Sequence, residues 1–416
     1  MTIATPARRA LLRDVPAGVW ALGFVSLLMD LSSEMIHALL PVYLLTVMGA
    51  SPLTIGAFEG VAESTASTAK VLSGALSDRL GKRKLLAAVG YGVAAFTRLI
   101  FPLAPTIGWL MAARFMDRIG KGVRGAPRDA LVADISPPDL RGASFGLRQS
   151  LDTIGSFLGP LAATALMWAT ANDFLAVFWA AAVPAFMALG LILAAVHEPN
   201  RPTDRHPEGK VWGRVEVRRL GAMTWWVVAV AAGLTLARFS EAFLVLRGLS
   251  IGLSPALTPA VLVVMNVAYS LSALPVGILS DRIGRVTILI VGLLLLTVAD
   301  GVLTLATGIV GVGVGVALWG LHMGFTQGVL ATLIADSAPS NLRGTAFGVL
   351  HLVTGVATLL ASVIAGALWD VAGPGGAFLA GASFAALSLL ALLPVRNKLD
   401  EIGPLSEALT VKTFCS

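Results

Sequence analysis

The sequence predicts an all-α membrane protein with twelve transmembrane helices in two parallel six-helix halves. Three observations predict this class. The 416 residues are 56% hydrophobic and only 13% charged, with a mean hydropathy of +0.83, which leaves too little charge for a soluble surface. Twelve segments have the roughly 20 mostly apolar residues that a span needs, and the two halves repeat one loop signature. With its one cysteine, the composition excludes a soluble enzyme, a nucleic-acid-binding protein and a disulfide scaffold.

The predicted spans follow one another with short connections rich in Gly, Pro, Asn and Asp, as at 49–52 and 102–105. The first six spans are 17–46, 52–76, 84–104, 107–134, 142–170 and 174–196. The last six are 221–246, 255–279, 286–306, 308–336, 343–369 and 375–394. The one long charged connection gives four parts: an N-terminal half 1–196, a cytoplasmic linker 197–220, a C-terminal half 221–394 and a cytoplasmic tail 395–416.

The positions of Lys and Arg predict the orientation of the spans. If the loops are numbered alternately, the side that holds both termini and the linker carries 20 of the 30 basic residues, and the other side carries only Arg247. Cytoplasmic loops are the ones enriched in Lys and Arg. We therefore expect a multi-pass protein of the cell (inner) membrane with both termini in the cytoplasm. The net charge of +6 then reports topology, not nucleic-acid binding.

An internal repeat relates the two halves. The stretch 74–83 reads GALSDRLGKR, and 277–285 reads GILSDRIGR, 203 positions later. A second pair, 133–146 and 335–348, ends in LRGASFG and LRGTAFG at an offset of 202. Two parallel six-span halves are a transporter architecture with the pathway between them. The alternative is a duplicated membrane scaffold or a membrane enzyme without transport.

The 6+6 spans, the long central loop and the signature G-x-L-x-D-R-x-G-[KR]-[KR] resemble the major facilitator superfamily over nearly the whole chain. The resemblance implies the major facilitator fold. In span 142–170, the run Gly155, Gly159 and Pro160 resembles a helix-packing motif typical of the family's antiporters, although Ala162 and Ala163 stand where that motif often has glycines. The resemblance therefore implies a secondary transporter, and it favours an antiporter.

The family resemblance also implies gating contacts. The aspartate of this signature holds the halves together when the cytoplasmic side is closed. Asp78 is then expected to pair with the start of span 343–369, and Asp281 with the start of span 142–170. The predicted gating residues are Gly74, Asp78, Arg79, Arg141, Asp281, Arg282 and Arg343. For Arg79, the alternative is that it only marks topology.

Charges inside the spans concentrate in the first half. Nine basic residues lie within spans, eight of them before the linker. Each costs about 2.5–3.5 kcal/mol at a helix centre, so such residues face a cavity or a partner. Helical spacing places polar stripes on spans 17–46, 52–76, 107–134 and 142–170. We expect these four stripes to form one polar cavity wall.

Depth along the helices gives the proton-coupling candidates. Asp30, Glu34 and Asp117 are expected near mid-membrane. The hypothesis is that one of them carries the coupling proton while Arg114, Arg118 or Lys121 tunes its proton affinity and attracts an anionic group. The alternative is a set of structural ion pairs. The substrate-cavity candidates are Glu59, Glu63, Arg114, Arg118, Lys121, Arg124, Arg148, Asp152, Arg238, Asn266, Tyr269, His322 and His351.

The predicted function is a secondary active transporter that moves a small organic solute by alternating access, as proton-coupled efflux. The second possibility is a proton-coupled importer of an anionic metabolite, which the basic stripe on span 107–134 would also suit. No catalytic residue, cofactor or metal is expected, and the chain holds no ATP-binding P-loop signature. The expected partners are a small-molecule substrate, protons and the lipid bilayer, with no nucleic acid, and a monomer is expected.

Overall fold

The computed structural model describes residues 15–80, 82–137, 140–198, 219–338 and 342–392, and their regular structure is entirely helical. The N-terminal half holds α1 (Ala17–Thr46), α2 (Pro52–Leu80), α3 (Arg83–Ile100), the 3-10 helix η2 (Phe101–Leu103), α4 (Ile107–Ile135), α5 (Arg141–Ala169) and α6 (Phe174–Ala195). The C-terminal half holds α8 (Ala222–Ala237), α9 (Ala242–Ser250), α10 (Ala260–Ile283), α11 (Arg285–Leu305), α12 (Ile309–Ser337) and α13 (Arg343–Leu392).

Each predicted span overlaps a described helix, and the all-α membrane class is confirmed. Eight of the described stretches are long and apolar enough to cross a membrane, and the last, Thr345–Leu392, has 48 residues. The helices α2, α4 and α5 are not among them although each has 29 residues, and they carry much of the predicted charge. The connection predicted at 370–374 is a kink inside α13, where Gly373 has a φ of 73° and Pro374 follows.

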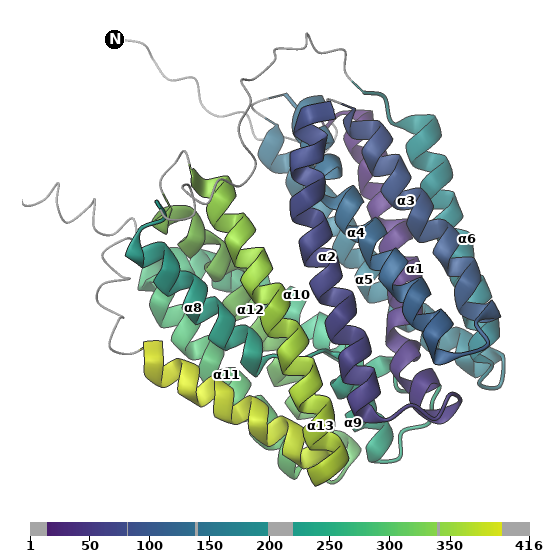
Figure 1. Ribbon diagram of the computed structural model, residues 1–416, viewed down its shortest axis with the longest axis vertical. Helices are drawn as coiled ribbons and strands as arrows, with labels where there is room; N and C mark the ends of the chain where they lie inside the picture. The colour runs from purple at the N-terminus through teal and green to yellow at the C-terminus, as the bar shows by residue number, and fades with distance from the viewer. Residues whose placement is uncertain (1–14, 81, 138–139, 199–218, 339–341, 393–416) are drawn as a thin grey trace, which may run out of the picture.

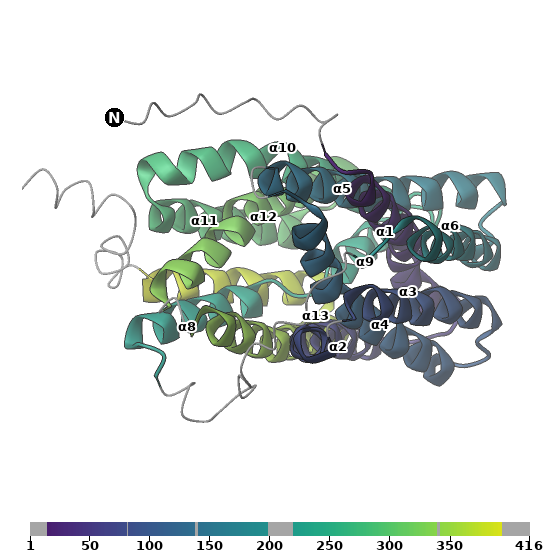
Figure 2. The ribbon, with the colours of Figure 1, turned by 90° about the horizontal axis from the view of Figure 1, so that it is seen from above.

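The helices form two bundles that stand side by side (Figures 1 and 2). Within the first bundle α1 packs on α5 and α6, and α4 packs on α2 and α3. Within the second, α12 packs on α10 and α11, and α13 packs on α8 and α11. Between the bundles, α2 lies along α13, α5 touches α10, and α1 touches α9. Two of these contacts between the bundles are equivalent, because each joins the second span of one half to the fifth span of the other.

The predicted span 221–246 overlaps the candidate membrane span Ala222–Ser250, but it is not one continuous helix. The segment 221–246 is interrupted between α8 and α9, at residues 238–241, which we call the α8–α9 break. The break holds no Pro or Gly. The backbone N–H of Ser240 donates to Ser362 Oγ on α13 at 3.3 Å, so a side chain of another helix takes the place of a helical acceptor. Discontinuous helices are typical of transporter binding sites.

The halves approach most closely at the end of the molecule opposite the linker. The linker end is the one where α2 and α10 stop and α3 and α11 begin, and Val196 and Gly221 lie there. At the opposite end, a Cβ on Gly56 would overlap the carbonyl oxygen of Ser362, and one on Gly366 would lie 2.6 Å from that of Pro52. The two glycines let α2 and α13 touch backbone to backbone, and in Figure 1 these helices converge at this end.

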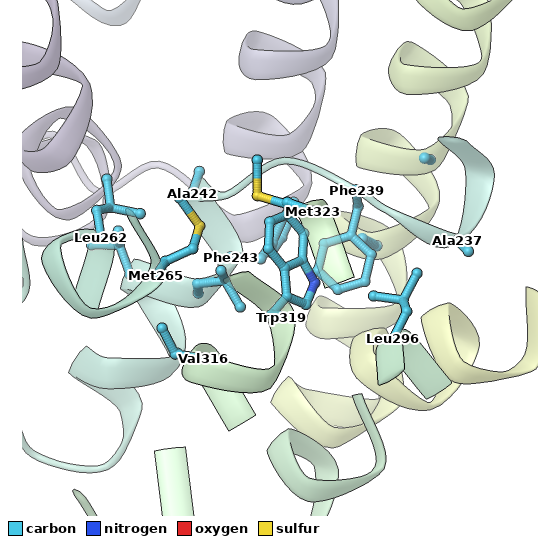
Figure 3. Packing of buried hydrophobic residues seen from close by; sticks show 14 of the residues in the cluster. Ala237, Phe239, Ala242, Phe243, Leu262, Met265, Leu296, Val316, Trp319 and Met323 are labelled. Carbon is cyan, nitrogen blue, oxygen red and sulfur yellow. The ribbon is translucent and has the colours of Figure 1, made fainter. Parts of the chain in front are cut away.

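The core of the C-terminal half surrounds the α8–α9 break. Phe239 in the break packs edge-on against Phe243 and Phe378. Figure 3 shows Phe239 and Phe243 beside Trp319 of α12, with Leu296 of α11 close by. All of these side chains are buried. The break is therefore held between α11, α12 and α13 by aromatic packing.

Candidate functional site

A cavity of about 490 Å³ lies between the two halves, a volume typical of sites for small organic ligands. One wall comes from α1, α2 and α4, and the other from α8, the α8–α9 break, α12 and α13. Six predicted site residues line it: Glu34, Glu63, Arg118, Lys121, Arg238 and His351. The remaining lining residues are His37, Ser67, Ala231, Leu234, Thr235, Phe239, Ser240, Glu241, Trp319, Thr326, Gln327, Leu330, Phe347, Leu350, Thr354 and Thr358.

A histidine between two carboxylates forms part of the N-terminal wall. His37 Nδ1 lies 3.3 Å from Glu34 Oε2, one turn earlier on α1. Its Nε2 lies 3.7 Å from Glu59 Oε2 on α2. Glu34 and His37 line the cavity, whereas Glu59 is buried behind them. An imidazole in this position can pass a proton between the cavity and the interior of the half.

Behind this wall, a fully buried ion-pair network joins α2, α3 and α4. Arg114 Nη2 lies 3.0 Å from Glu59 Oε2, and Arg98 Nη2 lies 2.9 Å from Asp117 Oδ1. Arg114 and Arg118 also approach Asp117 Oδ2, at 4.0 Å and 3.8 Å. Asp117 therefore stands among three guanidinium groups, and no residue of the network is more than 1% exposed. Surrounded in this way, Asp117 is held as a carboxylate and has no opening to the cavity.

Arg98 connects this network to α1. Its Nε donates to Ser32 Oγ at 3.0 Å and its Nη2 donates to Ser33 Oγ at 2.7 Å. Ser32 in turn donates to the carbonyl of Ala181 on α6. The two hydroxyls satisfy donors that would otherwise be buried without acceptors. Arg98 thus ties together four of the six helices of its half.

Two cations of α4 reach the cavity. Arg118 Nη1 lies 3.1 Å from Glu63 Oε1, so its charge is shared with α2. Lys121, one turn further along α4, is exposed to the cavity, and no described carboxylate lies within 4.0 Å of it. Lys121 is therefore the cation of this wall that is available to a solute.

A second network lies nearer the linker end. Arg128 lies 3.2 Å from Asp129 and 3.4 Å from Asp152, and Arg148 lies 3.4 Å from Asp129 and 3.9 Å from Asp152. Asp30 on α1 lies beside Asp152 on α5 in the same cluster. The predicted candidates Asp30, Arg148 and Asp152 therefore belong to one cluster that lies outside the cavity lining.

Arg124, predicted for the cavity, points elsewhere. It is 3% exposed, and its guanidinium lies 5.1 Å from the centroid of the Tyr91 ring on α3. This cation–π contact anchors α4 to α3.

The C-terminal wall carries two ionisable groups from the α8–α9 break. Arg238 and Glu241 both line the cavity, and among the described side chains neither has an oppositely charged group within 4.0 Å. The ion pair that their i, i+3 spacing would allow in a helix is absent because the helix is broken between them. Both charges are therefore left to the cavity.

Three second-half candidates lie outside the lining. His322 is fully buried, and its Nδ1 donates to the carbonyl of Gly292 on α11 at 2.9 Å. Tyr269 Oη donates to Gln327 Oε1 at 3.3 Å, which places it behind a cavity residue. Asn266 Nδ2 donates to the carbonyl of Ser156 on α5 at 3.4 Å, a contact between the two halves.

The predicted gating and packing residues have different outcomes. The structure does not describe the surroundings of Gly74 or the side chains of Asp78, Arg79, Asp281, Arg282 and Arg343. Arg141 is exposed. A Cβ on Gly155 would overlap the Leu27 carbonyl, and one on Gly159 would overlap Glu34 Cβ. Pro160 follows inside α5. These two glycines set the close approach of α5 to α1.

Sequence reasoning missed several lining residues. Helical spacing places His37 on the same polar face of α1 as Glu34, but His37 was not among the predicted site residues. Phe239, Trp319 and Thr326 are indistinguishable in sequence from core residues. Asp300, the one acidic residue of the otherwise apolar span 286–306, was also overlooked, and its position in an apolar segment was the available signal.

The chain matches a known family along most of its length. The sequence profile described as Major Facilitator Superfamily matches residues 22–265 and 220–412. The protein belongs to the major facilitator superfamily. It is a secondary transporter and not an enzyme, and it spans the membrane several times.

Comparisons with single proteins agree with this membership. An uncharacterised MFS-type transporter of Methanocaldococcus jannaschii is 32% identical over 389 residues, which cover 92% of this chain and 95% of the relative. The multidrug resistance protein MdtH of Yersinia pestis is 26% identical over 174 residues, 42% of each chain. Among solved structures, the nucleoside transporter NupG aligns with a TM-score of 0.76 at 13% identity, covering 91% of this chain and 99% of NupG. That likeness concerns the fold alone.

Proposed function

We propose that this member of the major facilitator superfamily exports a small organic solute in exchange for protons, through the cavity between its halves. The observation that carries the proposal is the Glu34–His37–Glu59 series, which begins at the cavity and continues into a buried ion-pair network. An exporter must release a proton where it binds solute. Glu34 stands on the cavity wall, where solute and proton would compete for it.

Of the three predicted proton carriers, we assign the coupling proton to Glu34. Asp117 is buried and compensated by three guanidinium groups. Protonation of Asp117 would therefore break the ion-pair network and would not depend on solute binding. Asp30 lies beside Asp152 but outside the cavity lining. Asp30 is therefore the second candidate, and it would act through its carboxyl pair.

The charges of the cavity favour a solute with both charged and apolar parts. Its lining holds three carboxylates, Glu34, Glu63 and Glu241, and three cations, Arg118, Lys121 and Arg238. This balance disfavours an importer selective for anions. Similarity to a multidrug resistance protein also supports export. Both termini are proposed to lie in the cytoplasm, because the basic residues concentrate on the linker side.

Transport by proteoliposomes tests direction and coupling together. The probes are ethidium as a cation, a fluoroquinolone as a zwitterion and citrate as an anion. An acidic interior drives accumulation by exchange, whereas an acidic exterior drives accumulation by symport. We expect accumulation with the acidic interior, and accumulation only with the acidic exterior would contradict export.

The variant Glu34→Gln tests the proton site. We expect it to bind and exchange solute without a response to the imposed pH step, because the amide cannot release a proton. Asp30→Asn is measured in parallel as the second candidate. Asp173→Asn, at an exposed helix N-terminus where Asn also caps, is the matched control and should keep the response. A full pH response in Glu34→Gln would reject the assignment.

A further inference from the structure

A buried carboxylate in the C-terminal half has no partner among the described residues. Asp300 lies on α11, the most apolar of the candidate spans, and it is 0% exposed. Within the described part of the chain, neither of its carboxylate oxygens has a hydrogen-bond partner. An ionised carboxylate without a donor in such surroundings strongly destabilises the fold. The position therefore calls for a bound cation or a proton.

Gly381 on α13 brings Asp300 close to the end of α8. A Cβ at this glycine would lie 2.5 Å from Asp300 Oδ2 and 3.2 Å from the carbonyl oxygen of Ala237. The ring of Phe239 lies at the same point, with Cε1 at 2.9 Å. A side chain at position 381 would clash with these groups, so the glycine lets the carboxylate and the carbonyl oxygen of Ala237 lie against the same point of α13.

The Ala237 carbonyl is available because α8 ends there. In a continuous helix it would accept from the N–H of Glu241, but the α8–α9 break removes that donor. None of the described residues donates to it in its place. Unwound carbonyl ends of broken helices are the groups with which transporters bind small cations.

Charged groups on the neighbouring elements are engaged elsewhere. Arg247 on α9 donates to the carbonyls of Leu303 and Ala306 at 2.9 Å and 2.5 Å. His322 on α12 donates to Gly292, and on the break Arg238 and Glu241 line the cavity. Asp370, the acidic residue of α13, accepts from Leu53 of α2. Among the described groups, none compensates Asp300.

We propose that Asp300 and the carbonyl end of α8 form a binding site for a small monovalent cation, a proton or a sodium ion, in the C-terminal half. A proton on Asp300 would donate to the Ala237 carbonyl, and a sodium ion would bridge the same two groups. Either one fixes the end of α8, and Arg238 follows Ala237 directly in the chain. Cation binding at Asp300 thereby sets the position of the cavity charges on the α8–α9 break.

The proposal rests on the proposed cation-coupled transport, but its test needs neither solute nor flux. Melting temperatures of the purified protein are measured with sodium against choline at constant ionic strength, and between about pH 5 and about pH 9. A ligand that binds only the folded state raises the melting temperature. We expect the wild type to gain on the order of 2 °C or more with sodium or on acidification.

The variant Asp300→Asn keeps the shape and removes the charge, so this gain should be lost. Gly381→Ala keeps the carboxylate but its Cβ would push Asp300 away from the end of α8, so it should lose the gain as well. Thr297→Val, which removes a hydroxyl bonded within α11, is the control and should retain it. Loss with sodium alone identifies a sodium site, and loss with acidification alone identifies a proton site.

Two results would overturn the site: a wild type whose melting temperature responds to neither ion, or Asp300→Asn with an undiminished response. If Asp300→Asn fails to fold, Gly381→Ala gives the answer, since an undiminished response there also rejects the site. A full pH response in the Glu34→Gln transport assay, together with melting that still depends on the cation, would reject the proposed coupling residue and leave this site standing.

Discussion

The two halves share a backbone plan and use it differently. In the N-terminal half, guanidinium and carboxylate groups are paired across α2, α3, α4 and α5, and the central pairs are at most about 1% exposed. In the C-terminal half, the corresponding volume is filled by aromatic and aliphatic side chains around a broken helix (Figure 3). The first half resists rearrangement because each charge needs its partner. The second half can move its wall without separating ion pairs.

The largest expected effect tests the cost of separating a buried pair. Asp117→Asn leaves Arg98, Arg114 and Arg118 without their common carboxylate, and we expect a loss of about 3–5 kcal/mol in the free energy of unfolding. Denaturant unfolding in mixed micelles measures it. Thr326→Val, a fully buried hydroxyl of α12, is the C-terminal counterpart and should cost only about 1 kcal/mol. Equal losses would remove the distinction between the halves.

An intermediate effect tests whether both halves depend on glycines that let two helices pack closely. Gly159 on α5 meets Glu34 on α1, and Gly320 on α12 meets the Met265 carbonyl on α10 in the same overlapping manner. We expect Gly→Ala at either position to cost about 1–3 kcal/mol, because a backbone must shift. Gly313→Ala, with nothing within 4 Å of the added Cβ, should be neutral or stabilising. A cost confined to one half would show that the two halves do not depend equally on close glycine contacts between their helices.

The smallest effect concerns the C-terminal wall of the cavity. Glu241→Gln removes a carboxylate that has no ion-pair partner within 4.0 Å among the described groups, so the free energy of unfolding should change by less than about 0.5 kcal/mol. Glu63→Gln on the opposite wall takes the partner from Arg118 and should cost more. Thermal unfolding of the two variants side by side measures the difference. A larger loss at Glu241 would reveal a hidden partner in the C-terminal half.

Much of the fold could be predicted because it depends on local properties. Runs of mostly apolar residues predicted spans that each overlap a described helix, and the positions of Lys and Arg predict the side on which each loop lies. The stripe on α4 predicted that its charges need partners, and Arg114, Arg118 and Asp117 found them on α2 and α3. Helical spacing fixes which face a residue lies on, so the N-terminal wall was accessible to sequence reasoning.

The rest depends on distant parts of the chain. The α8–α9 break carries no Pro or Gly, and it is bonded to Ser362, which is 122 residues away from Ser240. Asp300 stands out only when the space beside Gly381 is known. His322 was predicted as a solute contact, but the nearby Gly292 carbonyl on α11 occupies it. No periodicity within one helix contains such information.

The charge of α2, α4 and α5 also bears on how the protein enters the bilayer during synthesis. Inserting an isolated α4 would place Arg114, Arg118 and Lys121 in hydrocarbon at about 2.5–3.5 kcal/mol each near the centre. The partners that neutralise Arg114 and Arg118 precede α4 on α2, so they are already synthesised when α4 emerges. The N-terminal half must therefore leave the insertion machinery as an assembled group of helices, whereas α11 and its apolar neighbours can partition into lipid one at a time.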